Sequence, residues 1–484
     1  MSTNDATLPA AQREQSPDQF VEAGDAGYKQ TMSNMQIQMI AIGGAIGTGL
    51  FLGLGARLQA SGPSLIVAYL ATGVIAYLLM RAIGELVVYR PTTGSFVSWA
   101  REFYGNRLAH LTGWIMVILG SLLGIVEVAA VAVYIQYWWP QMPAGLGALC
   151  AWMLLIGSNL FSARVFGFIE VAASSIKIIA ISLFIMAGLA ITFFGGPMGL
   201  QTEAAVSNLW SEGFFTNGVA AMALASAGVV FSFSGVELTA VAAGEARNPR
   251  EVMPKVARSV VWRILVFYVG SVLVLSMLMP TSGYSGAQSP FVTALSGFDI
   301  PWLGSVMNFV VLTAAVSSIN ATMYASVRGL RNLAANREAP AFANRMSSRG
   351  VPVGALSSIG AVLLIGVAAT AFFGGVHIFE LALSACAVCI VILWITMFAC
   401  QLRLRRWQLT GRVPVVAYTM PGAPYTSWIG IIALALVWVS MAVPGLAADW
   451  QFPLLGTVLL LALITLGYQF TYRRGRIPAA HINS

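Results

Sequence analysis

The chain has 484 residues, of which 58% are hydrophobic and only 9% are charged, and its mean hydropathy is +0.79. Soluble domains carry about 25% charged residues, so this composition excludes a water-soluble fold and predicts an all-α polytopic membrane protein. The formal net charge of +8 is typical of basic cytoplasmic loops in a membrane protein, and it does not indicate a nucleic-acid partner.

Apolar runs of about 20 residues, each long enough to cross the hydrocarbon core as a helix, recur along the chain. We expect about 12 transmembrane helices, near residues 36–58, 63–86, 109–138, 143–163, 168–193, 216–242, 259–280, 301–333, 353–373, 376–400, 425–446 and 451–472. Residues 1–34 are polar and lack the features of a signal peptide, so we expect a disordered cytoplasmic tail there.

The basic residues segregate to one side of this topology. Of the 26 Lys and Arg residues, only Arg57 falls on the outer side, whereas the outer loops hold Glu203, Glu212, Asp299 and Asp449. Cytoplasmic loops of membrane proteins are enriched in Lys and Arg. The pattern therefore favours an even number of spans with both termini in the cytoplasm. Two amphipathic cytoplasmic stretches, 91–109 and 248–259, are expected to be connectors at the membrane surface.

The sequence predicts neither a metal site nor an enzyme. Its four cysteines lie in or at the ends of apolar runs, and the lone CxxC at Cys386 and Cys389 is interpreted as two small core residues. The chain has no HExxH motif and no convincing Ser/His/Asp set. A membrane-embedded hydrolase using Glu127 or Glu237 as general acid or base stays open as an alternative.

The first span is rich in glycine, with six glycines among residues 43–55. Each costs a helix about 1 kcal/mol relative to alanine, which favours a helix broken in the middle of the membrane. Such a break is tolerated only where the unpaired backbone lines a cavity or binds a ligand. Free amides would suit a carboxylate and free carbonyls an ammonium group. The alternative is close helix packing through pairs such as Gly43 with Gly47.

The sixth span favours the binding interpretation. Ser232, Ser234, Gly235 and Glu237 interrupt another apolar stretch at the matching place in a second half of the chain. Interrupted helices at corresponding positions are typical of inverted-repeat transporters that bind substrate at the repeat interface. We therefore expect a substrate site between the first and sixth spans.

Ionisable residues deep in spans are costly and usually functional. Glu127 lies in the third span, Lys177 in the fifth and Glu237 in the sixth. Glu127 and Lys177 could neutralise each other, Lys177 could snorkel to the cytoplasmic face, or one of them could exchange a proton during a transport cycle. In the eighth span, Ser318 could line a pocket or bond to its own helix backbone.

The sequence resembles the amino acid permeases of the amino acid, polyamine and organocation transporter superfamily, specifically the bacterial amino acid transporter family. The matching residues are QMIAIGGAIGTGLFLG (38–53), RAIGEL (81–86), FSFSGVEL with AAGEARNP (231–249) and SPFV (289–292). The resemblance covers nearly everything from residue 35 to residue 476. Within the family, PKVARSVVWRILVFYVGS (254–271) and PGAPYTSW (421–428) look most like asparagine permeases.

This resemblance implies a fold of five plus five helices in an inverted repeat, with discontinuous helices 1 and 6. The transport core would cover 35–400, with repeats at about 35–193 and 216–400. Two additional helices would occupy 401–473, followed by a cytoplasmic tail over 474–484.

The resemblance also implies the roles of individual site residues. The amides of Ala45, Ile46, Gly47, Thr48 and Gly49 would hold the substrate carboxylate, and the carbonyls of Ile42, Phe231 and Ser234 would accept its ammonium group. Lys177 would occupy the position of the ion in sodium-driven relatives, and Glu127 would be the usual acid of the third span. The remaining expected site residues are Ser232, Gly235, Glu237 and Ser318. Ala240 departs from the family, because many members have glycine there.

We therefore expect a proton symporter that imports an amino acid, asparagine first, across the bacterial cytoplasmic membrane. Its expected partners are the amino acid, the proton and the lipid bilayer, with no cofactor. The alternatives are an amino acid exchanger, a permease for 4-aminobutyrate, arginine or aromatic amino acids, and a sensor that binds without transporting.

Overall fold

The protein is a bundle of long helices. The computed structural model describes residues 46–91, 95–159, 163–195, 203–237, 249–298, 300, 302–347, 351–442 and 451–473. Its α-helices are α2 (Thr48–Phe51), α3 (Gly53–Ser61), α4 (Leu65–Tyr89), α5 (Ser95–Tyr104), α6 (Asn106–Gln136), α7 (Ala144–Asn159), α8 (Ala163–Phe194), α9 (Asn208–Ser211), α10 (Gly218–Ser232), α12 (Pro249–Arg263), α13 (Gly270–Leu278), α14 (Pro290–Ser296), α15 (Leu303–Ala335), α16 (Val353–Phe373), α17 (Gly375–Leu409), α18 (Tyr425–Ala442) and α19 (Gln451–Arg473).

The helices have the length and composition of membrane spans. Within the described ranges, nine helical segments are long and apolar enough to cross a membrane, and α7 and α10 contribute two shorter apolar helices. The all-α polytopic architecture predicted from the sequence is therefore confirmed. The sequence predicts a surface connector at 248–259. In the structure, α12 continues through a π-helical turn (Ile264–Val269) into α13, so that most of this stretch belongs to a helical segment long enough to span the membrane.

The corner between the first two spans depends on Gly62. Its φ of +64° lies in the left-handed region, which glycine adopts without strain, and a Cβ there would lie 2.0 Å from Oγ1 of Thr216. The amide of Ser64 donates a hydrogen bond to the carbonyl of Phe214 at 2.8 Å. The turn between α3 and α4 is thereby fastened to the chain that leads into α10.

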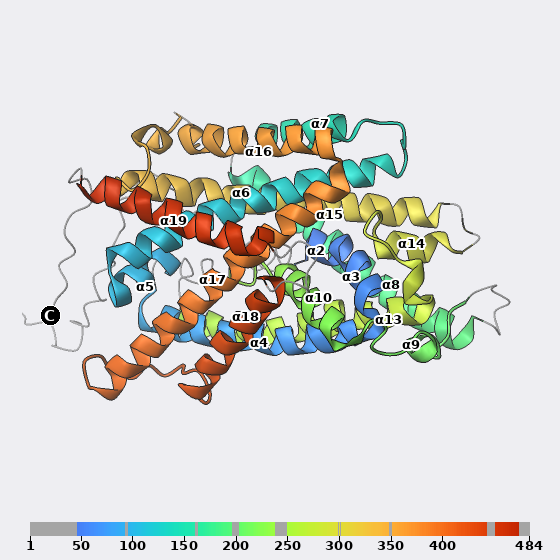
Figure 1. Ribbon diagram of the computed structural model, residues 1–484, viewed down its shortest axis with the longest axis horizontal. Coiled ribbons are helices and arrows are strands. Elements are labelled where there is room, and N and C mark those ends of the chain that lie inside the picture. Colours follow the sequence, from blue (N-terminus) through green and yellow to red (C-terminus); the bar gives the residue numbers. More distant parts are fainter. Residues whose placement is uncertain are drawn as a thin grey trace, which may run out of the picture.

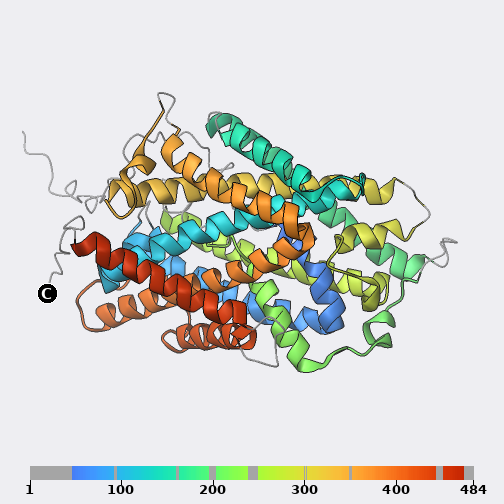
Figure 2. The ribbon, with the colours of Figure 1, turned by 45° about the horizontal axis from the view of Figure 1, so that its top comes forward.

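The long helices α6, α15 and α17 form the centre of the bundle, and α6 packs against both of the others. In Figures 1 and 2, α7 and α16 lie together on one side of these central helices, with α4 and α18 on another. Helix α19 packs on α6, α17 and α18, but only 6% of its apolar window is buried. It is therefore suited to face lipid.

The last turns of α4 and α17 lie together with α5 at one end of the bundle, to the left in Figure 1. We call it the basic end, because these segments carry Arg90, Arg101 and Arg405. There the fully buried Glu85 of α4 accepts hydrogen bonds from Nε2 of Gln401 at 3.0 Å and from the amide of Met420 at 2.8 Å. Arg405 lies 3.5 Å from the same carboxylate. These contacts hold the segment between α17 and α18 against α4.

We expect Gly84→Ala to weaken this attachment. A Cβ on Gly84 would lie 2.5 Å from Cε1 of Tyr418. The guanidinium of Arg81 lies over the ring of Tyr418, 4.0 Å from the ring centroid. Overpacking of this kind costs about 1–3 kcal/mol, and it should lower the apparent Tm of the purified protein in detergent.

Gly157→Ala in α7 is the matched control, because a Cβ there meets nothing within 4 Å. It should be neutral or slightly stabilising, since alanine is the better helix former. Equal losses in the two variants would argue against the contact between Gly84 and Tyr418.

Candidate functional site

Helix α2 begins beside the broken end of another helix. Gly47 is extended, with φ −124° and ψ −161°, and the helix begins at Thr48. The first amides of a helix have no acceptor within it. A Cβ on Gly49 would lie 2.9 Å from Cα of Ser232, so the first turn of α2 lies directly against the end of α10. Of the amides predicted to bind a carboxylate, those of Ile46 to Gly49 lie here, whereas Ala45, like Ile42, falls outside the described residues.

Helix α10 ends at Ser232, inside the apolar run predicted to be the sixth span. The chain then turns through residues 233–237, and Gly235 has a φ of +94° that other residues rarely adopt. The amide of Ser234 donates to the carbonyl of Phe231 at 2.9 Å. The turn after α10 and the beginning of α2 thus line the same cavity.

Two tyrosines that the sequence interpretation missed support the broken end of α10. The hydroxyl of Tyr268 donates to the carbonyl of Ser232 at 3.0 Å, and the hydroxyl of Tyr69 donates to Oγ of Ser232 at 3.1 Å. Oγ of Ser232 donates in turn to the carbonyl of Gly228 at 3.0 Å. The Phe233 ring stacks on Tyr268 with centroids 4.9 Å apart. The predicted site residue Ser232 is therefore bonded to the protein, and single tyrosines in apolar spans were the available signal.

Glu127 lies beside the start of α2. A Cβ on Gly47 would lie 2.8 Å from Oγ of Ser318 and 3.4 Å from Oε1 of Glu127. The carboxylate of Glu127 also interacts with Thr48 and is attracted by Lys177. Among the described residues, Oε2 of Glu127 is buried without a hydrogen-bond partner. One carboxylate oxygen therefore remains for a further polar contact where α2, α6 and α15 pack together.

Lys177 is completely buried in α8, so it does not snorkel to either end of the bundle. It lies near Glu127 but does not contribute to the wall of the cavity described below. Of the two residues predicted to couple transport to protons, Glu127 therefore lines the cavity and Lys177 does not.

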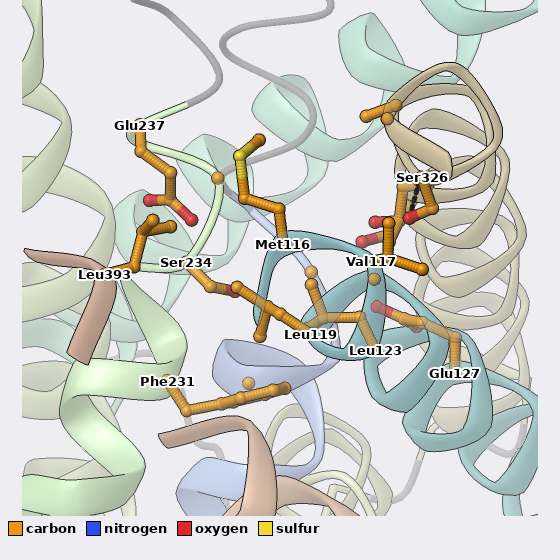
Figure 3. Close-up of a pocket in the computed structure, with 18 of the residues that line it drawn as sticks. Met116, Val117, Leu119, Leu123, Glu127, Phe231, Ser234, Glu237, Ser326 and Leu393 are labelled. Carbon is orange, nitrogen blue, oxygen red and sulfur yellow. Dashed lines mark hydrogen bonds between the residues drawn. The ribbon is translucent and has the colours of Figure 1, made fainter. Parts of the chain in front are cut away.

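Glu237 lies on the other side of the same cavity. Its side chain is 4% exposed, and its Oε2 accepts a hydrogen bond of 3.4 Å from Nε1 of Trp394 in α17. Figure 3 shows Glu237 and Glu127 on opposite sides of the cavity, with Ser234 and Leu119 between them. A ligand in this space would lie between two carboxylates.

The cavity encloses about 790 Å³ of empty space, open solvent at its mouth included. Its lining residues are Gly47, Thr48, Gly49, Phe96, Met116, Val117, Leu119, Gly120, Leu123, Glu127, Phe231, Ser232, Ser234, Gly235, Glu237, Ser318, Thr322, Ala325, Ser326, Gly329 and Leu393. Because α5 and the parts of α6 and α15 nearest the basic end contribute to this wall, the cavity extends from the broken helices toward the basic end.

An ion pair closes the structure on the other side of the broken helices. The guanidinium of Arg57 in α3 bonds Glu380 of α17 through both carboxylate oxygens, at 2.7 and 3.0 Å. A Cβ on Gly228 would lie 1.8 Å from Nε of Arg57, so the arginine crosses α10 where that helix has no side chain. The sequence pattern placed Arg57 alone among the basic residues on the outer side, but it did not predict that Glu380 is its partner. The pair ties α3, α10 and α17 together.

Comparison with known proteins shows the family. The amino acid permease family model matches residues 36–478. The chain is 41% identical to the L-asparagine permease of Escherichia coli (strain K12) over 87% of this chain and 85% of that protein. It is 40% identical to the L-asparagine permease of Salmonella typhimurium, covering 90% and 88% of the two chains. It is 39% identical to that of Streptomyces coelicolor, covering 92% and 90%. The chain therefore belongs to the amino acid permease family, and it is a multi-pass membrane transporter of amino acids, not an enzyme.

Proposed function

We propose that this transporter imports L-asparagine across the bacterial cytoplasmic membrane by proton symport. The observation that carries the proposal is the meeting of two broken helices and Glu127 at one cavity. The choice of asparagine rests on the names of the similar permeases. The positive-inside rule supports an orientation with the basic end, and with it both termini, in the cytoplasm.

In this proposal the substrate backbone is held by the protein backbone. The amides of Ala45 through Gly49 bind the carboxylate, because the start of a helix carries partial positive charge and free donors. The carbonyls of Ile42, Phe231 and Ser234 accept the ammonium group. Gly235, Glu237 and Ser318 complete the wall, and Ser232 acts through the hydrogen bonds that support the end of α10.

The proton is carried by the buried pair of Glu127 and Lys177. A charged pair away from water is stable only while both partners remain charged and close. A proton taken up by Glu127 removes its attraction for Lys177 and also changes the charge beside Gly47. Occupancy of the substrate site and protonation of the pair are therefore coupled through one carboxylate.

The conformation of the protein supports release toward the cytoplasm. The cavity extends toward the basic end, whereas Arg57 and Glu380 tie the helices on the opposite side. Inward transport then requires an alternate state in which this ion pair is separated and the cavity wall near the basic end is closed.

Purified protein in liposomes tests the proposal directly. An inside-alkaline pH gradient should drive accumulation of labelled L-asparagine, and unlabelled L-asparagine should compete more strongly than any other of the twenty amino acids. Stronger competition by another amino acid would refute the assigned substrate. Counterflow that persists without gradient-driven accumulation would instead identify an exchanger.

Lys177→Met should separate transport from the proton. Methionine keeps an unbranched apolar stem of similar length in a fully buried position but removes the charge that faces Glu127. We expect counterflow of L-asparagine to continue, which reports a folded protein, while accumulation no longer follows the pH gradient. Accumulation that remains gradient-driven would exclude Lys177 from coupling.

Gly47→Ala should weaken substrate binding by about tenfold or more, equivalent to ~1.4 kcal/mol. Alanine tolerates the extended backbone of Gly47, but its Cβ would lie 2.8 Å from Oγ of Ser318, in the space proposed for the carboxylate. Calorimetric titration of the purified protein with L-asparagine measures the change.

Gly467→Ala in α19 is the control, because a Cβ there meets nothing within 4 Å. Its affinity should equal that of the unmodified protein. Unchanged affinity in Gly47→Ala would show that the substrate carboxylate binds elsewhere.

A further inference from the structure

A second cavity lies near the basic end, between α4 and α12, and none of its lining residues belongs to the cavity at the broken helices. It encloses about 660 Å³ of empty space, open solvent included. Tyr77 and Arg81 line it from α4, one helical turn apart. Pro254, Arg258 and Trp262 line it from α12, where their spacing of four residues gives one helix face.

The charge of this cavity is entirely positive. Among the described residues, its lining includes two arginines and no acidic residue. Arg81 donates to the carbonyl of Thr419 at 2.5 Å and stacks on Tyr418, both neutral groups, and its Nε is buried without a hydrogen-bond partner in the described part of the chain. The nearest turn of α4 carries Glu85, whose Oε2 accepts hydrogen bonds from Gln401 and Met420 and whose Oε1 lies 3.5 Å from Arg405. The cavity is therefore suited to an anion.

The outer wall of the cavity is apolar and exposed. Trp262 is 65% exposed, and Leu265 and Val266 are each 42% exposed. All three belong to the helical segment Met253–Leu278, which is long and apolar enough to span the membrane. Tryptophan and tyrosine are enriched where the hydrocarbon core meets the headgroups. Arg81 and Arg258 line the same cavity as Tyr77 and Trp262, so we expect them near the headgroups.

We propose that this cavity binds the phosphate of an acidic phospholipid, with Arg81 and Arg258 at the headgroup and the Trp262 face along an acyl chain. Guanidinium groups bind phosphate oxygens in pairs, and basic pockets between membrane helices are suited to anionic headgroups. Inorganic phosphate offers the same anion. The exposed apolar wall favours the lipid, because a free ion has nothing to bury against it.

Native mass spectrometry of the delipidated protein in detergent tests the proposal by titration with phosphatidylglycerol, phosphatidylcholine or inorganic phosphate. We expect a saturable phosphatidylglycerol site and weaker phosphatidylcholine binding. Arg258→Gln should weaken phosphatidylglycerol binding on the order of fivefold or more, as expected for one cation at a lipid phosphate. The titration requires no transport, so its result is independent of the proposed substrate and of proton coupling.

Lys255→Gln is the matched control. Lys255 lies on the same helix and is exposed, and its substitution removes the same charge, but it does not line the cavity. Its phosphatidylglycerol affinity should change less than about twofold, since only the diffuse surface attraction falls. Equal losses in both variants would overturn the proposal in favour of non-specific surface charge. Displacement of phosphatidylglycerol by millimolar inorganic phosphate would overturn it in favour of a free-anion site.

Discussion

The structure depends on one constraint, which is that backbone polar groups in the interior of a membrane must find partners. The regular backbone hydrogen bonding of a helix is interrupted at two places in this protein, at the start of α2 and at the end of α10. Part of the cost is offset inside the protein, because Tyr268 bonds the carbonyl of Ser232 and the turn after α10 bonds the carbonyl of Phe231. Both interruptions line one cavity, which the proposed function assigns to a substrate with a carboxylate and an ammonium group.

The ionisable residues of the interior are distributed around this same cavity. Glu127 and Glu237 lie on its opposite sides, and Lys177 lies close enough to Glu127 to attract its carboxylate. Each is costly to bury, and each is close to one of the broken helices or to a helix that packs against it. The three buried charges therefore lie around one cavity. In the proposed function, a substrate bound there is close to all of them.

Helix α17 is tied to the first part of the chain at both of its ends. Glu380 bonds Arg57 of α3 on one side of the cavity, and Gln401 bonds Glu85 of α4 at the basic end. Between these ties, Trp394 donates to Glu237. Any change in the relative position of α3, α4 and α17 must therefore alter at least one polar contact close to the cavity. Contacts of a fully buried group such as Glu85 are costly to leave unmade, so such a change requires replacement partners.

Hydropathy, glycine content and the segregation of basic residues determined the fold class, the approximate spans and the two helix interruptions. These features are local, because the length of an apolar run and a cluster such as residues 43–55 act on the backbone wherever the segment lies. The same reasoning identified Glu127, Lys177 and Glu237, since a charge inside an apolar run is visible without a structure.

Only the tertiary structure decided which groups meet. The hydrogen bonds of Tyr69 and Tyr268 to Ser232, the pairing of Arg57 with Glu380, and the attachment of Met420 to Glu85 join residues 36 to 335 positions apart. The sequence of one helix does not specify which face of a distant helix it contacts, because that choice is made by the packing of all side chains at once. For the same reason, the sequence predicted polar residues for the site, whereas the fold determined that Ser232 would support the broken helix and that Glu127 would lie beside Gly47.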